Sequence, residues 1–154
     1  MPETVSVTVH IDAPAETVWS MVTDLPRMGE WSPENTGGSW AKGSTGPALG
    51  ARFKGTNRNG IRRWSTGTEI VVFDEPTHFA FETVAGPIRA ARWSYRIAPS
   101  ADGGGCDVTE TWDDLRGPVF KPISAFATGV KDRAEHCRTA MRTTLENLKA
   151  AAEA

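Results

Sequence analysis

One long amphipathic helical pattern follows a much longer stretch of strand-like sequence, and this order limits how the chain can fold. Across about residues 124–152, apolar residues recur at steps of three or four, while Arg, Lys and Glu fill the opposite side. The apolar positions are Phe126, Val130, Ala134, Cys137, Met141, Leu145 and Leu148. This spacing predicts one long helix with a single apolar face. A sheet formed by the preceding residues therefore has only one helical face to pack against.

The residues before this helix are typical of strands separated by turns. Residues 4–11 alternate strictly between apolar and polar, which predicts a half-buried strand. Residues 12–33 contain two short helical segments, and the second ends at Trp31-Ser32-Pro33 because a residue before proline avoids the helical conformation. Turn signals at 59–60, 74–77, 85–87 and 98–105 divide residues 35–114 into about six antiparallel strands. The predicted fold class is α+β, with about seven strands and a long C-terminal helix.

Composition narrows the class of protein further. The 154 residues suit one domain, and 39% hydrophobic with 23% charged residues excludes extensive disorder. The net charge of −2 predicts no overall attraction to nucleic acid, and no apolar run is long enough for membrane insertion. Only Cys106 and Cys137 are present, and the first residues lack the pattern of a signal peptide, so we expect a reducing, cytoplasmic location.

Turn geometry predicts which side chains share a face of the sheet. A two-residue turn at Asn59-Gly60 would place Phe53 opposite Thr66 and Gly55 opposite Trp64. The missing side chain of Gly55 would then leave room for the indole.

The next two hairpins extend the same face. A four-residue loop at 74–77 would pair Val72 with Phe79. At 85–87 we favour a three-residue turn, because a two-residue turn would expose Trp93 and Tyr95 together.

The predicted inner face combines large apolar side chains with a few polar ones. Its apolar members are Phe53, Trp64, Ile70, Val72, Phe79, Phe81, Trp93, Tyr95, Val108 and Trp112, and its polar members include Asn57, Arg62, Thr66, Thr68 and Glu110. One helix cannot cover so wide a face. We therefore expect an open apolar hollow with a few converging polar groups, which is the usual form of a small-molecule site.

At this point the sequence resembles the START-like (SRPBCC) helix-grip superfamily, most closely its polyketide cyclase/dehydrase and lipid-transport branch. The resemblance covers essentially the whole chain and rests on Val5-x-Val7-x-Val9, on Asp12-Ala13-Pro14-Ala15-Glu16-Thr17-Val18-Trp19, on Trp31-Ser32-Pro33, on Gly50-Ala51-Arg52-Phe53-Lys54-Gly55, and on Leu145-Glu146-Asn147-Leu148-Lys149. It implies a single ligand-binding domain over residues 1–154, in which a curved antiparallel sheet wraps around the C-terminal helix. Family activities range from lipid carriage to aromatic polyketide cyclisation and hormone sensing, and the fold does not choose among them.

Together these observations predict non-covalent binding of a hydrophobic small molecule or lipid, aromatic or polycyclic, in an internal cavity. The residues expected around the ligand are Phe53, Asn57, Trp64, Phe81, Trp93, Tyr95, Glu110, Trp112 and Val130. The chain has six Trp, and the alternative is that those on the strands only fill the core.

Glu110 is the polar residue whose surroundings matter most. In an apolar hollow its pKa would rise and it could act as a general acid or base, with Tyr95 as a hydrogen-bond donor. The alternative, which we favour, is an ion pair with Arg62, Arg89 or Arg133, or a position in water at the mouth of the hollow. A polyketide cyclase or dehydratase using Tyr95 and Glu110 is therefore a second hypothesis.

A third hypothesis is a protein-interaction module whose outer basic strands meet an acidic surface. We predict no metal and no cofactor. His10, His78 and His136 lack metal-ligand spacing with a carboxylate, and His136 and Cys137 point about 100° apart on a helix. The sequence makes no prediction about oligomeric state.

Overall fold

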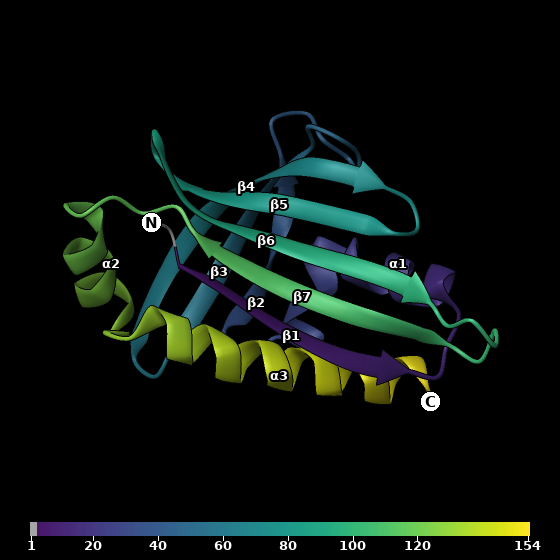
Figure 1. The fold of residues 1–154 in the computed structure, drawn as a ribbon. Helices are drawn as coiled ribbons and strands as arrows, with labels where there is room; N and C mark the ends of the chain where they lie inside the picture. Colours follow the sequence, from purple (N-terminus) through teal and green to yellow (C-terminus); the bar gives the residue numbers. More distant parts are fainter. Residues whose placement is uncertain (1–2) are drawn as a thin grey trace.

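The computed structural model describes residues 3–154, which form a curved, seven-stranded antiparallel sheet that grips a long C-terminal helix (Figure 1). The sheet order is β1-β7-β6-β5-β4-β3-β2. The strands are β1 (Thr4–Ile11), β2 (Asn35–Ala41), β3 (Arg52–Asn59), β4 (Arg62–Asp74), β5 (His78–Ala85), β6 (Ile88–Pro99) and β7 (Cys106–Asp114). The helices are α1 (Ala15–Val22), the 3-10 helix η1 (Leu25–Glu30), α2 (Phe120–Thr128) and α3 (Arg133–Ala152). The α+β helix-grip prediction, including the two short helices, is confirmed.

The first two strands lie at opposite edges of the sheet, because β1 pairs with β7 while β2 pairs with β3. Helices α1 and η1 carry the chain across the sheet between these edges, and they add the buried side chains of Val18, Trp19 and Leu25 to the core. The indole of Trp19 contacts Phe73 and Phe79, with ring centroids 5.1 and 6.0 Å apart. Trp19 thus packs α1 against β4 and β5.

Helix α3 packs mainly on one side of the curved sheet. Its principal neighbours are β1, β7 and α1, and its buried residues are Ala134, Cys137, Met141, Thr144, Leu145 and Leu148. Strand β4 lies farther across the sheet and contacts α2 instead. Part of the inner face is therefore left without a covering helix, as expected.

The prediction of one continuous C-terminal helix is wrong at its beginning. Helix α2 ends at Gly129, whose φ of 75° is in the left-handed region that favours glycine. Helix α3 begins after Asp132, whose carboxylate accepts a hydrogen bond from the Glu135 amide at 3.1 Å. The break turns Phe126 out to solvent, whereas Val130 stays buried.

The β3–β4 register differs from the prediction by two residues. Gly60 and Ile61 form the turn, so Phe53 lies opposite Thr68 and Gly55 opposite Thr66. Gly60 has a φ of 62°, which suits the first central position of a hairpin turn. Because the shift is two residues, the residues that pair between β3 and β4 keep their predicted faces.

Two β-bulges change the strand pairing in the other two predicted hairpins. A bulge between Ile70 and Val72 turns Phe73 toward the core and pairs it with Phe79, so the predicted Val72–Phe79 pair is wrong. The 85–87 turn contains two residues and not three, because Ala85 pairs with Ile88.

A second bulge restores the faces predicted for β6. The extra residue is Ala90 on β6, because Thr83 pairs with Ala91 and Val84 with Arg89. Trp93 therefore pairs with Phe81 and Tyr95 with Phe79. The two rings face inward as predicted, but through a bulge and not through the turn.

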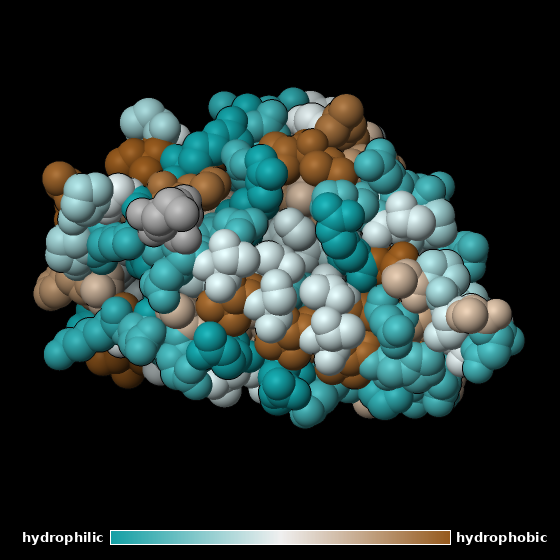
Figure 2. Space-filling model, in the orientation of Figure 1, coloured by the Kyte–Doolittle hydropathy of each residue, from teal (hydrophilic) through white to brown (hydrophobic). Residues whose placement is uncertain are grey.

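The outer side of β1 and β7 is polar and regular. Ser6 and Thr8 face Thr111 and Thr109, and each pair of hydroxyl oxygens is 2.8 Å apart. Figure 2 shows these strands as a pale band across the front of the molecule. The alternation along residues 4–11 is therefore that of a strand with one core face and one solvent face, as predicted.

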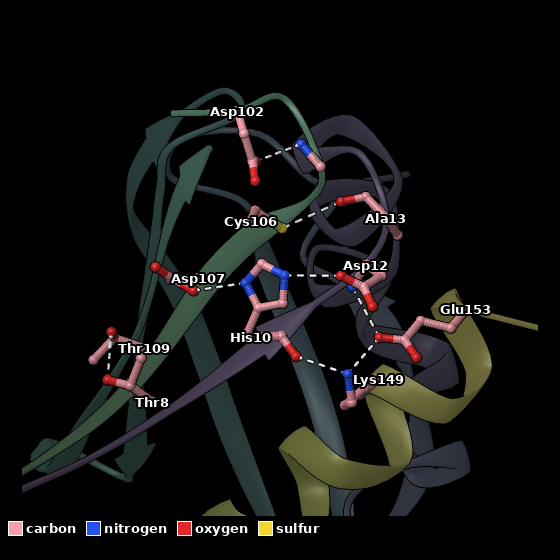
Figure 3. Close-up of polar contacts among 11 residues, drawn as sticks. Thr8, His10, Asp12, Ala13, Asp102, Cys106, Asp107, Thr109, Lys149 and Glu153 are labelled. Atoms are coloured by element: carbon pink, nitrogen blue, oxygen red, sulfur yellow. Dashed lines mark hydrogen bonds and ion pairs between the residues drawn. The ribbon is translucent and has the colours of Figure 1, made fainter. Parts of the chain in front are cut away.

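Polar contacts fix the C-terminal end of α3 to the end of β1 (Figure 3). Lys149 Nζ donates to the main-chain oxygen of His10 at 3.0 Å, and Glu153 accepts a bond from the Asp12 amide at 2.8 Å. The His10 ring lies between Asp107 and Asp12, at 2.9 and 2.8 Å. We call this group of residues the closed end. Separately, none of the helices in residues 3–154 has the length and apolar character needed to cross a membrane.

Candidate functional site

A cavity of about 350 Å³ lies between the inner face of the sheet, α2 and the first half of α3. The sheet supplies residues from β2 to β7, and these include Phe53, Trp64, Phe81 and Trp93. Helix α2 supplies Phe120, Ile123, Ser124, Ala127 and Thr128, and α3 supplies Arg133, His136, Cys137, Ala140, Met141 and Thr144. The wall is mostly apolar, with isolated polar groups.

Eight of the nine predicted ligand residues line this cavity. They are Phe53, Asn57, Trp64, Phe81, Trp93, Tyr95, Glu110 and Trp112. Val130 is buried but does not line it, because the break between α2 and α3 takes it off the helical face on which it was predicted. The Asn57 amide donates to Thr66 Oγ1 at 3.2 Å and so links two strands at the wall.

The tryptophans of the cavity differ in how far they are packed. Trp112 is fully buried, and the Arg116 guanidinium lies 6.0 Å from the centre of its ring. Trp64 and Trp93 are only half-buried. These two indoles, and not Trp112, therefore have faces that a bound molecule could contact.

Tyr95 and Glu110 form the most buried polar pair of the cavity. They lie opposite each other on β6 and β7, and the Tyr95 hydroxyl donates to Glu110 Oε1 at 2.9 Å. Burial raises the pKa of Glu110 to about 8, although the Tyr95 hydrogen bond acts in the other direction. Burial, with the nearby Glu110 charge, also raises the pKa of Tyr95 well above its ordinary value.

Glu110 is buried and forms no ion pair with the described residues, so the alternative favoured from the sequence is wrong. Arg62 donates to the main-chain oxygen of Phe126, and Arg133 pairs with Glu34. The third candidate, Arg89, pairs with Glu69 and Glu82 on the outer face. Within residues 3–154, Glu110 Oε2 is the one buried side-chain nitrogen or oxygen atom that has no hydrogen-bond partner.

A second polar group at the cavity wall was not predicted. Glu34 Oε2 lies 2.5 Å from His136 Nε2, and Glu34 Oε1 lies 3.2 Å from Arg133 Nη1. These two contacts lower the pKa of Glu34 against the effect of its burial. Arg133 and His136 are three residues apart on a helix and so share a face, which is the signal that could have identified them.

Cys137 lines the cavity beside this group but is not a reactive thiol. Burial raises its pKa to about 12, so the thiol stays protonated at neutral pH. Among residues 3–154, no three His, Cys, Asp or Glu side chains lie where they could hold a metal ion together.

Three basic residues of the outer strands, Arg52, Arg89 and Arg92, pair with acidic residues of the same strands. Glu69 lies 3.6 Å from Arg52 and 2.7 Å from Arg89, and Glu82 lies 2.7 Å from Arg92. The hypothesis of an interaction module that uses these strands therefore loses much of its electrostatic basis.

A curved sheet that closes on a long helix around an apolar cavity defines the helix-grip class of ligand-cavity proteins. Within that class, the chain belongs to the polyketide cyclase / dehydrase and lipid transport family, whose model matches residues 2–153. No curated protein matches the chain at a significant level.

Solved structures support the fold over nearly the whole chain. The polyketide-cyclase-like protein Cgl2372 from Corynebacterium glutamicum is 28% identical, with a TM-score of 0.60, and the match covers 99% of this chain and 90% of that one. The di-domain ARO/CYC protein BexL from the BE-7585A biosynthetic pathway is 21% identical, with a TM-score of 0.72; the match covers 99% of this chain but 50% of BexL. Major latex-like protein 151 from Panax ginseng is 14% identical, with a TM-score of 0.73 and coverage of 98% and 97%. The family and these neighbours support a ligand-binding or cyclase role.

Proposed function

We propose that the chain binds a hydrophobic, aromatic or polycyclic small molecule non-covalently in this cavity. Trp64 and Trp93 would contact the apolar body of the ligand, and Glu110, held in place by the Tyr95 hydroxyl, would bind a single oxygen atom of it. The buried cysteines, Cys106 and Cys137, are both free thiols, which supports a reducing location such as the cytoplasm.

The unpartnered Oε2 atom of Glu110 is the observation that carries this proposal. A buried polar atom without a hydrogen bond costs about 1–3 kcal/mol, so a partner that enters the cavity regains that energy. Because the pKa of Glu110 is about 8, the carboxyl group is neutral at neutral pH. Tyr95 already donates to Oε1, so the acid proton on Oε2 is available for an acceptor. The matching ligand group is a carbonyl or ether oxygen.

The test uses Nile red, which is neutral and polycyclic and carries a carbonyl group. We expect saturable binding, with quenching of tryptophan fluorescence, and displacement by polycyclic ketones such as anthrone. Trp93→Ala and Trp64→Ala should each weaken binding about tenfold, because each removes a large aromatic contact. Trp40→Ala is the matched control, since Trp40 is also half-buried but lies on edge strand β2 outside the cavity. Equal affinity in all four proteins would refute the proposal.

The pH dependence tests the role of Glu110. Affinity for Nile red should be constant below about pH 8 and fall above it, because the donor becomes a carboxylate that repels the carbonyl oxygen. Glu110→Gln keeps an N–H donor that does not titrate, so its affinity should not change with pH. The same fall in both proteins would exclude Glu110 as the anchor.

Aromatic polyketide cyclisation with dehydration is the second candidate, favoured by a carboxyl group that can exchange a proton near neutral pH. Below about pH 8 Glu110 is mainly neutral, so it would act as the general acid that protonates a departing hydroxyl group, which leaves as water. The neighbouring carbon–hydrogen bond breaks as the carbon–carbon double bond forms, and its proton passes to the Glu110 carboxylate, which becomes the neutral acid again. Tyr95 donates to Glu110 Oε1 and would hold the carboxyl group in position for this transfer.

Catalysis and simple binding can be separated with Glu110→Gln and a poly-β-ketone thioester as substrate. A cyclase should lose turnover at least 100-fold while substrate affinity is retained. If wild type gives no cyclised product under conditions where it binds the thioester, the binding function stands without catalysis.

A further inference from the structure

Helix α2 presents an apolar stripe to solvent. Val119, Ile123 and Phe126 are 77%, 58% and 78% exposed and are spaced four and three residues apart, so they share one helical face. Thr128 is the buried residue of α2. The stripe is therefore available for a contact outside this chain.

The β3–β4 hairpin extends this stripe. Asn59 Nδ2 donates to the Thr128 oxygen at 2.9 Å, and Arg62 donates to the Phe126 oxygen with its guanidinium 5.4 Å from the Phe126 ring centre. These contacts hold the turn residue Ile61, which is 99% exposed, beside α2. We call Ile61, Val119, Ile123 and Phe126 the α2 patch.

The α2 patch is surrounded by positive charge, although the whole chain is slightly negative. Residues 58–63 contain Arg58, Arg62 and Arg63, residues 115–131 contain Arg116, Lys121 and Lys131, and neither segment contains an acidic residue. Arg58 and Arg62 donate to main-chain oxygens and not to carboxylates. Arg116 and Lys121 share the buried Asp114. The remaining positive charge lies beside exposed apolar side chains.

This surface borders the mouth of the cavity. Ile123 and Ala127 line the cavity and are also exposed to solvent. In Figure 2, apolar residues gather at the end of the molecule where Figure 1 places α2. Whatever covers the α2 patch would therefore face the entrance to the ligand site.

We propose that the α2 patch docks on the surface of an anionic lipid bilayer. Its apolar side chains would enter the boundary between headgroups and acyl chains, and the basic residues would contact lipid phosphates. Ile61 and Phe126 are 99% and 78% exposed, and a bilayer accommodates such side chains without a shaped counterpart, whereas a protein partner would need a matching concave surface. The arrangement places the cavity mouth against the membrane.

The experiment measures cosedimentation of ligand-free protein with two kinds of vesicle, phosphatidylcholine alone and phosphatidylcholine mixed with phosphatidylglycerol. Wild type should bind the mixed vesicles at least tenfold more strongly than the neutral ones. The triple variant Ile61→Ser/Val119→Ser/Phe126→Ser should lose at least tenfold in binding to the mixed vesicles. None of these three residues lines the cavity, so Nile red binding should be unchanged and the two proposals can fail separately.

Matched controls come from the loop beyond the other end of β3. Leu49→Ser removes a side chain that is 69% exposed, and it should leave vesicle binding unchanged. Likewise Arg58→Glu/Lys131→Glu should weaken binding, whereas Lys42→Glu should not. Circular dichroism establishes that each variant is folded.

Three results would overturn the proposal. The first is the absence of binding to mixed vesicles at low salt, and the second is equal binding by the triple variant and wild type. The third is a concentration-dependent dimer of wild type, lost in the triple variant without any vesicle binding. That result would assign the patch to a second copy of the chain.

Discussion

The two ends of helix α3 have different surroundings, because one end packs into the core and the other borders the cavity. At the closed end, Leu145 and Leu148 are completely buried, and Lys149 and Glu153 attach the helix to β1. At the other end, α3 and α2 border a cavity, and Arg133 faces Glu34 across its wall. One sheet and one helix thus provide stability at one end and leave space at the other. The difference arises because the helix packs on β1 and β7 and not across the whole sheet.

The largest effect should come from the pH dependence that Glu110 imposes on stability. Its pKa is about 8 in the folded protein, against an ordinary value of 4.5. Between these two values the folded state holds a proton that the unfolded state has released, so the stability contribution is complete below about pH 4.5 and is lost as the pH rises toward 8. The loss should be on the order of 5 kcal/mol.

Urea denaturation of wild type and Glu110→Gln from pH 4 to 9 measures this effect as a difference between the two proteins. Glu34 and Asp114 are present in both proteins, so their contributions cancel when one stability curve is subtracted from the other. The lowered pKa values of these two residues give stability that is lost as the pH falls. If the two curves stay parallel across the window, Glu110 does not bind a proton in the folded state.

The next largest effect compares a core residue with a cavity residue. Leu148→Ala at the closed end should lower the free energy of unfolding by about 3 kcal/mol, because it leaves a void in close-packed surroundings. Trp64→Ala removes a larger side chain, yet it should cost only about 1 kcal/mol, because Trp64 is half-buried beside an existing cavity. Urea denaturation at pH 6 measures both. A larger loss in Trp64→Ala would mean that this indole is a core residue.

The sequence predicted faces better than it predicted pairings. Alternation identified the inner residues of β7, where Glu110 and Trp112 are buried as expected. The bulges between Ile70 and Val72 and between Thr83 and Val84 have no local sequence signal, so the strand pairs that depend on them could not be derived. A register error of two residues leaves each side chain on its predicted face of the sheet, but it changes the residue with which each one pairs.

The candidate site was predicted to a similar extent. Its aromatic wall follows from the inner faces, whereas the Tyr95–Glu110 bond depends on the exact β6–β7 register. The pair of Glu34 and His136 joins residues 102 positions apart, and no local pattern can reveal such a contact. The break before α3 did have signals, Gly129 and the Asp132-x-x-Glu135 cap, but the continuous apolar stripe outweighed them.

Asp132 should give a smaller effect at the open end. Asp132→Ala removes the hydrogen bond to the Glu135 amide and should destabilise the protein by about 1 kcal/mol. Asp132→Asn keeps an acceptor oxygen and is the control. Amide hydrogen exchange should increase at residues 133–137 and not at 145–152, because fraying begins at the uncapped terminus. Uniformly faster exchange along α3 would mean that its two ends do not open separately.

The smallest effect belongs to the closed end, where hydrogen bonds to Asp107 and then Asp12 raise the pKa of His10 above 6.5. The protonated ring stabilises the fold, so this contribution is complete below pH 6.5 and is lost as the pH rises through the folded pKa. Thermal melting of wild type and His10→Gln should therefore differ at pH 5.5 and converge by about pH 9. The pH dependence that Glu110 imposes on stability has the same sign as that of His10, but the two respond differently to salt. Screening should weaken the exposed His10 contacts, whereas the buried Glu110, whose pKa is raised by desolvation, should respond little. A difference at His10 that persists in high salt would contradict an electrostatic origin and leave only packing of the ring.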